Sequence, residues 1–314
     1  MFTLLLVGGY SAYKHFSGLD TLKLDPQAIL KDAVKIKTPA QLTAFLSTIK
    51  LPQKADVNNQ PVLEKLAISP MPNAEGLFKF LLVADSHSDN VDLQKALTQA
   101  KQSYPDLAFI IGLGDYTEVG TVNEFKDAKI ELDRAGLRYF LIAGDHDLWD
   151  SRDKQKDPGE NYKQVFGPLY QSFILNNFKF LLLDNSDNYK GISEEEQGWI
   201  TDQLEKSKKE GVSGVFVFIH EPLYHPFSDH FMGRVEKDLK KQAQSLIFQL
   251  KASGVKKVFS GDIHYFSEYE EPVTKLSMVT VGAVAKERNP QAPRFALVTV
   301  FADGLTKVED IEIK

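Results

Sequence analysis

Aspartate and histidine residues recur in five short segments that lie far apart in the chain. The segments are DSH (Asp85–His87), GLGD (Gly112–Asp115), GDHD (Gly144–Asp147), HEP (His220–Pro222) and GDIH (Gly261–His264). Aspartate oxygens and histidine nitrogens are ligands for first-row metal ions, and this set is large enough for two ions. Two ions about 3.5–4 Å apart can clamp a phosphoryl group and activate the water that attacks it. The segments therefore indicate metal-dependent phosphoryl chemistry.

Each segment has a simpler interpretation when it is taken alone. Asp85 and Asp115 could cap the helices that follow them, because aspartate is a common helix N-cap. His220 could be a hydrogen-bonded histidine of the core, and Gly261–His264 could be a polar turn. Three consecutive ionisable residues at 145–147 are harder to explain, because they are unfavourable after a buried strand unless solvent or a cation stabilises them. All five simple interpretations would have to hold together, which favours one shared site.

Apolar runs that are typical of buried strands precede the five segments. Six runs are found, at residues 78–84, 107–114, 138–144, 178–185, 214–220 and 256–261. Between them, apolar residues at helical spacing predict helices at 90–103, 121–135, 193–209 and 235–253. Alternating strands and helices predict a largely parallel sheet, and ligand sites in such sheets form beyond the carboxyl ends of the strands. Five strand ends would therefore carry the five segments to one surface.

The C-terminal part of the chain follows a different pattern. Three strand-like runs, at 276–284, 294–301 and 305–314, have no helices between them and predict antiparallel hairpins on a second sheet. Asp184 and Asn185 also follow a strand-like run, and we interpret them as turn or capping residues.

Composition limits the classes of partner. The 314 residues are 43% hydrophobic and 25% charged, as in an ordinary globular protein, and the net charge is −6. No basic patch for nucleic acid is evident, so an anionic substrate would need a local cation, which bound metal ions would supply. The chain has no cysteine, which excludes disulfides and thiolate nucleophiles.

Three regions are expected along the chain. Residues 1–16 are mostly apolar but shorter than the ~20 residues of a membrane span. They could join the core as a strand or helix, but we favour the remnant of a signal or membrane anchor, because the polar residues 17–75 resemble a linker. Residues 76–314 would form the catalytic domain. A tether of this kind predicts a location outside the cytoplasm, with a cytoplasmic location as the alternative.

The order and approximate spacing of the five segments resemble the five motifs of the calcineurin-like metallophosphoesterases, over about Phe78–Phe266, with GDYTE (Gly114–Glu118) as the second motif. The resemblance implies an α/β fold, a four-layer αββα sandwich of two mixed β-sheets flanked by helices. It implies two metal ions and a phosphate-ester substrate, either a monoester or a diester.

The resemblance also implies a role for each residue. The first ion would be held by Asp85, His87, Asp115 and His264, and the second by the bridging Asp115 with Asp145, His220 and Asp262. A hydroxide that bridges the ions would be the nucleophile. His146 would assist the leaving group or contact the phosphate, and Asp147 would orient His146 and support its protonated state.

Two residues depart from the family pattern. Asp145 stands where the third motif usually has Asn, and Asp262 stands where the fifth usually has His. Both changes add a charged oxygen ligand at the second ion, so we expect manganese or iron there, with magnesium, calcium and zinc as further candidates. The alternative is an impaired second site, in a membrane-tethered metal-binding or ligand-binding module that performs no hydrolysis.

Overall fold

Residues 78–314 are the part of the chain that the computed structural model describes, and they contain two mixed β-sheets. The five-stranded sheet has the order β11 (Thr306–Glu312), β10 (Arg294–Val300), β1 (Phe78–Val83), β2 (Leu107–Gly112) and β3 (Tyr139–Leu141). The six-stranded sheet has the order β4 (Gln171–Leu175), β5 (Phe178–Leu182), β6 (Gly214–Phe218), β7 (Val255–Ser260), β9 (Ser277–Thr280) and β8 (Ser267–Glu270).

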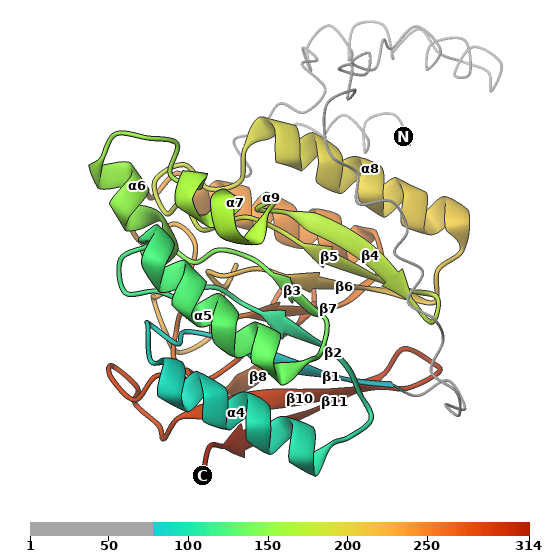
Figure 1. Ribbon diagram of the computed structural model, residues 1–314. Coiled ribbons are helices and arrows are strands. Elements are labelled where there is room, and N and C mark those ends of the chain that lie inside the picture. Colours follow the sequence, from blue (N-terminus) through green and yellow to red (C-terminus); the bar gives the residue numbers. More distant parts are fainter. Residues whose placement is uncertain (1–77) are drawn as a thin grey trace, which may run out of the picture. The chain divides into compact units, whose positions relative to one another are not determined.

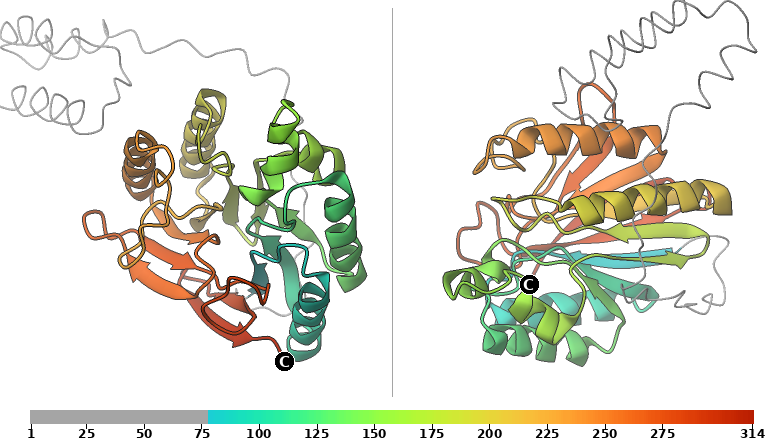
Figure 2. Two further views of the ribbon diagram at one scale, coloured as in Figure 1. Left: turned by 90° about the vertical axis from the view of Figure 1, so that its left-hand side faces the viewer. Right: turned by 90° about the horizontal axis from the view of Figure 1, so that it is seen from above.

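Helices cover the outer face of each sheet, so the described residues form four layers (Figures 1 and 2). The five-stranded sheet packs against α4 (Asn90–Ser103), α5 (Val122–Ala135) and α7 (Glu160–Phe166). The six-stranded sheet packs against α8 (Glu194–Glu210) and α9 (Leu239–Ala252). A short 3₁₀ helix, η1 (His146–Leu148), and α6 (Trp149–Asp153) follow β3. The expected four-layer sandwich is confirmed.

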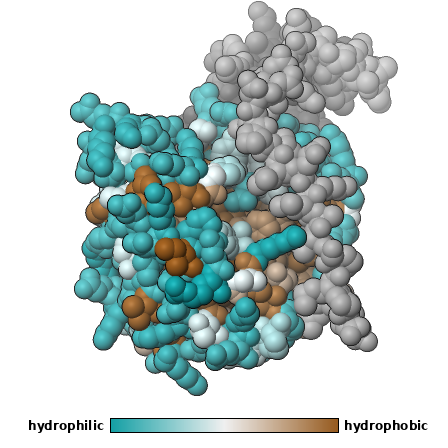
Figure 3. All heavy atoms as spheres, viewed as in Figure 1, coloured by the Kyte–Doolittle hydropathy of each residue, from teal (hydrophilic) through white to brown (hydrophobic). Residues whose placement is uncertain are grey.

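Phenylalanine side chains fill the space between the two sheets. On β1, Phe80 and Leu82 face the other sheet, whereas Leu81 and Val83 face the helices. The Phe80 ring lies 5.7 Å from the Phe180 ring of the second sheet, edge on. Strands that are buried on both faces have continuous apolar sequences, which explains why these runs were recognisable. The face shown in Figure 3 is mainly hydrophilic, with separate hydrophobic patches.

The expected distribution of strands between the sheets is wrong in two respects. The parallel strands do not form one sheet, because β1, β2 and β3 belong to one sheet and β5, β6 and β7 to the other. The C-terminal strands do not form a sheet of their own. β10 pairs antiparallel with β1 and β9 pairs parallel with β7, so the C-terminal strands are added to both existing sheets.

The expected N-terminal anchor (1–16) and linker (17–75) lie outside the described residues. Among residues 78–314, none of the helices combines the length and the apolar character that crossing a membrane requires.

Candidate metal centre

The carboxyl ends of β1, β2, β3, β6 and β7 meet at one place and bring all seven predicted metal ligands together. Among residues 78–314, five groups of three have their ligand atoms within 4.8 Å of one another, and two of these hold six of the predicted ligands. The first group is Asp85, His87 and His264, and the second is Asp145, His220 and Asp262. Each group combines residues that are far apart in the sequence. The predicted convergence of five strand ends is therefore present in the structure.

Asp115 lies between the two groups. Its Oδ2 atom is 3.7 Å from Nε2 of His87 in the first group and 3.6 Å from Nε2 of His220 in the second. Its Oδ1 atom accepts a hydrogen bond from the backbone N–H of His146. One carboxylate oxygen thus faces both groups, which is the position that a bridging ligand requires.

Helix capping does not occupy the aspartates of the centre. Asp89 caps α4, its side chain accepting from the N–H of Asp92, and Thr121 caps α5 in a reciprocal pair with Glu124. The simpler interpretation of Asp85 and Asp115 as caps is therefore wrong. Both carboxylates remain available to the centre.

Several residues of the centre have left-handed backbone conformations, which are unfavourable for residues other than glycine. The φ angles are 53° at Asp85, 53° at Asp115 and 68° at Asp262. Such strain persists only where the surrounding structure enforces it, and it concentrates at functional sites. All three carboxylates have ligand atoms in the centre.

Close packing around Asp115 requires glycine at position 144. A Cβ atom at Gly144 would lie 2.1 Å from Oδ1 of Asp115, closer than any real contact. The glycines that precede the aspartates in these motifs therefore allow two strand ends to approach each other.

Backbone carbonyls orient two of the histidines. Nδ1 of His220 lies 2.7 Å from the carbonyl oxygen of Leu113, and Nδ1 of His264 lies 3.1 Å from that of Arg288. A ring nitrogen that faces a carbonyl carries the proton, so Nε2 of each ring is the nitrogen left to face the centre. Metal-binding histidines are commonly held in this way.

The centre concentrates negative charge in a buried place. Among residues 78–314, the ion pairs of Asp85, Asp115, Asp145 and Asp262 are all with histidines, and none is with lysine or arginine. Burial raises the pKa of Asp85 and of Asp262 above the ordinary value. Burial opposes the charged form of His220, but the neighbouring Asp115 outweighs it and raises the pKa of the imidazole. The group as a whole therefore favours binding positive charge.

Unpartnered atoms point to the same conclusion. Nε2 of His220 and Oδ2 of Asp262 are buried and have no hydrogen-bond partner among the described residues. A buried polar atom without a partner is costly. Oxygen and imidazole donors around such atoms fit metal ions, so the residues present fit a two-ion centre.

The contacts of His146 and Asp147 differ from those expected if Asp147 oriented His146. Nδ1 of His146 lies 2.8 Å from the carbonyl oxygen of Glu118, and the ring stacks on Trp149 at 3.8 Å. The Asp147 carboxylate instead accepts from the N–H of Gly144 and from the N–H and hydroxyl of Thr117. Burial and the charge of Asp115 raise the pKa of Asp147 to about 7. Asp147 therefore connects the loops after β2 and β3, and Glu118 and Trp149 orient His146.

Two asparagines that sequence reasoning did not place in the centre support its second group. Nδ2 of Asn188 donates to Oδ2 of Asp145 at 3.0 Å, which leaves Oδ1 facing His220. Oδ1 of Asn185 accepts from the N–H of His220 at 2.9 Å, so its interpretation as a turn residue was incomplete. The only signal for Asn185 in the sequence was its place at the end of an apolar run.

His230 also lies at the second group, with Nε2 3.3 Å from Oδ1 of Asp262. It comes from the loop after β6. From the sequence, this loop could be either a wall of the substrate site or a surface loop.

The comparisons identify the class. A model of the calcineurin-like phosphoesterase family matches residues 78–266, and the chain belongs to this family. It is 25% identical over 195 residues to a serine/threonine-protein phosphatase, CPPED1, of Danio rerio, covering 57% of this chain and 62% of the relative. It is 31% identical over 147 residues to a probable glycerophosphodiester phosphodiesterase, GpdQ, of Arcobacter nitrofigilis, covering 43% of this chain and 50% of the relative. The matches thus span about half to three fifths of these relatives.

A solved structure shares the fold. A dimetal phosphatase from Danio rerio superimposes with a TM-score of 0.58 at 16% identity, covering 76% of this chain and 98% of that protein. At this identity the likeness shows the fold alone.

Proposed function

We propose that this protein hydrolyses a phosphomonoester or a phosphodiester with two metal ions held by the residues described above. The observation that carries the proposal is the position of Asp115, whose Oδ2 faces His87 of one group and His220 of the other at nearly equal distances. Asp85, His87 and His264 would complete the first ion's ligands. Asp145, His220 and Asp262 would complete the second's.

Bound ions would supply positive charge to the phosphoryl oxygens and would lower the pKa of the water that attacks phosphorus. The protein's own residues set the geometry around them. The carbonyl of Glu118 fixes Nδ1 of His146, so the other ring nitrogen is directed toward the substrate space. A protonated His146 would donate from Nε2 to the leaving oxygen, while stacking on Trp149 keeps the ring in place.

The ligand types favour manganese or iron. The predicted ligands of the second ion are three carboxylates, Asp145, Asp262 and the bridging Asp115, and one imidazole, His220. Hard oxygen donors suit manganese, iron, magnesium and calcium better than zinc. The relatives are named a phosphatase and a phosphodiesterase, so both ester classes belong in a substrate panel.

The test is turnover of an aryl phosphomonoester and an aryl phosphodiester by the purified chain with Mn²⁺. We expect hydrolysis of at least one ester and its loss in Asp115→Asn. Asp229→Asn, which removes an exposed carboxylate of the loop after β6, is the matched control and should retain the rate. Two bound ions with no turnover of any ester would contradict the proposal. One ion per chain with no turnover would favour the non-hydrolytic alternative with an impaired second site.

A further inference from the structure

The loop between β9 and β10 carries an arginine to the metal centre. Arg288 has a φ angle of 55°, a left-handed conformation that is unfavourable for an arginine. The next residue anchors the loop, because Nδ2 of Asn289 donates to the carbonyl oxygens of Ala283 and Ala285 at 3.0 and 2.9 Å. The carbonyl oxygen of Arg288 lies 3.1 Å from Nδ1 of His264. The backbone of Arg288 is therefore fixed against a residue of the centre.

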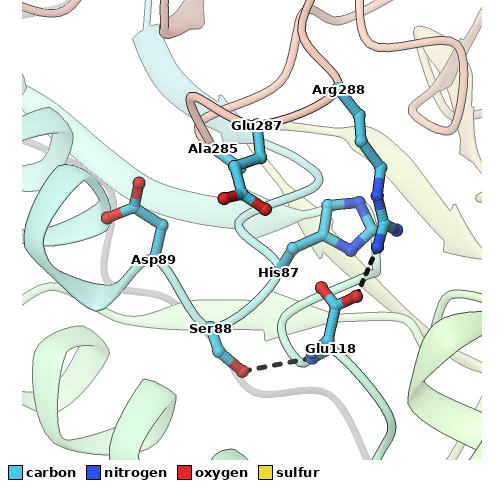
Figure 4. Close-up of a pocket in the computed structure, with 7 residues that line it drawn as sticks. All are labelled: His87, Ser88, Asp89, Glu118, Ala285, Glu287 and Arg288. Atoms are coloured by element: carbon cyan, nitrogen blue, oxygen red, sulfur yellow. Dashed lines mark hydrogen bonds and ion pairs between the residues drawn. The ribbon is translucent and has the colours of Figure 1, made fainter.

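The side chain of Arg288 extends from this loop toward Glu118 (Figure 4). Its Nη2 donates to the carboxylate of Glu118, which follows β2. Its Nη1 lies 3.4 Å from Nε2 of His146, the nitrogen assigned above to the leaving group. The guanidinium thus stands where the reacting group of a substrate would meet His146.

A cavity of about 390 Å³ lies at this place, and of the residues from 78 onward that line it, Arg288 is the one lysine or arginine. The other charged side chains of the lining are acidic, namely Asp89, Glu118 and Glu287, and His87 of the centre also lines it. The Arg288 side chain is 49% exposed, so the guanidinium is free to exchange partners. The acidic side chains of the rim would repel a phosphate ester, and Arg288 would offset that repulsion beside the positive charge that bound metal ions supply.

On the basis of the proposed function, we infer that Arg288 is a substrate-binding residue that contacts the phosphate of the ester, and that Glu118 holds its guanidinium while no phosphate is bound. Arginine presents a planar fork of N–H donors that matches two phosphate oxygens. Phosphate and Glu118 compete for the same donors. The ion pair is therefore a resting contact that opens when the substrate enters.

Competition makes the two partners respond in opposite directions. Arg288→Ala removes the donors and should weaken phosphate binding about 10- to 100-fold, the usual loss for hydrogen bonds to a charged group. Glu118→Gln keeps the carbonyl that orients His146 but removes the competing charge, and should strengthen phosphate binding about 2- to 5-fold. A purely structural ion pair would give weaker binding in both variants.

The experiment measures the affinity of the Mn²⁺-loaded full chain for inorganic phosphate by calorimetry, together with metal content and KM for an aryl ester. Lys286→Ala is the matched control, because Lys286 is an exposed cation of the same loop that does not line the cavity. We expect Arg288→Ala to weaken phosphate binding and raise KM with metal content unchanged, and Lys286→Ala to stay within about twofold of the parent.

Four results would overturn the inference: no measurable phosphate binding by the parent chain, unchanged affinity in Arg288→Ala, equal losses in Arg288→Ala and Lys286→Ala, or weaker binding in both Arg288→Ala and Glu118→Gln. Absence of turnover with the expected pattern of phosphate affinities would instead refute hydrolysis and leave the phosphate site in place.

Discussion

The Nε2 atoms of His87 and His264 lie 3.1 Å apart, although 177 positions separate the two residues in the chain. Because Nδ1 of His264 faces the carbonyl of Arg288, its Nε2 directs a lone pair toward His87. The pair joins the end of β1 to the end of β7, one strand from each sheet. The first group of ligands therefore exists only when both sheets are assembled.

Removal of the His264 imidazole should prevent the first group from binding its metal ion. His264→Ala should bind one ion fewer and lose activity by at least about 100-fold, because even indirect support of a ligand is commonly worth 10- to 100-fold. Metal analysis after gel filtration in Mn²⁺ measures the first effect and ester hydrolysis the second. His225→Ala, an imidazole of the loop after β6 that belongs to neither group, should keep two ions. Equal metal content in both variants would remove His264 from the centre.

Asn188 should matter for the second ion although it does not belong to either group. Its amide holds Oδ2 of Asp145, so Asn188→Ala should weaken binding of the second ion about 10- to 100-fold. Asn188→Asp replaces the donor with a second carboxylate against Asp145, and should weaken binding of the second ion further. Calorimetric titration with Mn²⁺ resolves the two binding steps. A change confined to the first step would contradict the pairing with Asp145.

Variants at Asp147 and His146 should affect different properties, the first mainly stability and the second mainly activity. Asp147→Ala leaves the buried N–H groups of Gly144 and Thr117 without their acceptor, so we expect a loss of about 3 kcal/mol in the free energy of unfolding. His146→Ala should change that free energy little and lower kcat by about 10²- to 10⁴-fold. Urea unfolding and steady-state kinetics measure the two quantities. If Asp147→Ala keeps the parent's free energy of unfolding but has a lower kcat, Asp147 supports catalysis through His146, as the sequence predicted.

Glu196 should make the fold less stable as pH rises. Its carboxylate is buried at the start of α8, where Oε1 accepts from the N–H of Asp184. Burial, with the charge of Asp184, raises the pKa of Glu196 well above the ordinary value. The folded state then keeps a proton that the unfolded state releases, so stability is highest below the unfolded pKa of about 4.5 and falls as pH rises above it. Each unit of such a shift costs about 1.4 kcal/mol.

Glu196→Gln removes this titration. The variant should therefore be more stable than the parent at pH 8 and closer to it at pH 5, as measured by urea unfolding at both values. Glu194→Gln, an exposed carboxylate of the same turn, should leave the pH dependence unchanged. A parent chain whose stability rises from pH 5 to pH 8 relative to Glu196→Gln would reverse the assigned direction.

The strands and the ligand set were predictable because each left a local signal. Strands such as β1 and β6 are buried on both faces and have continuous apolar sequences, and the aspartates and histidines follow them directly. The division into two sheets left no such signal, because the pairing of β10 with β1 joins residues more than 200 positions apart. The same holds for Asn188 and Arg288, whose roles depend on which loops meet across the centre. The predicted link between Asp147 and His146 rested on adjacency in sequence, which does not require contact between the side chains.

Anomalous diffraction at the manganese edge, from crystals of the Mn²⁺-loaded chain, tests the two-ion centre most directly. We predict two peaks about 3.5–4 Å apart on either side of Asp115, one among Asp85, His87 and His264 and the other among Asp145, His220 and Asp262. A single peak at full Mn²⁺ loading, or peaks away from Asp115, would contradict a pair of ions shared through that carboxylate.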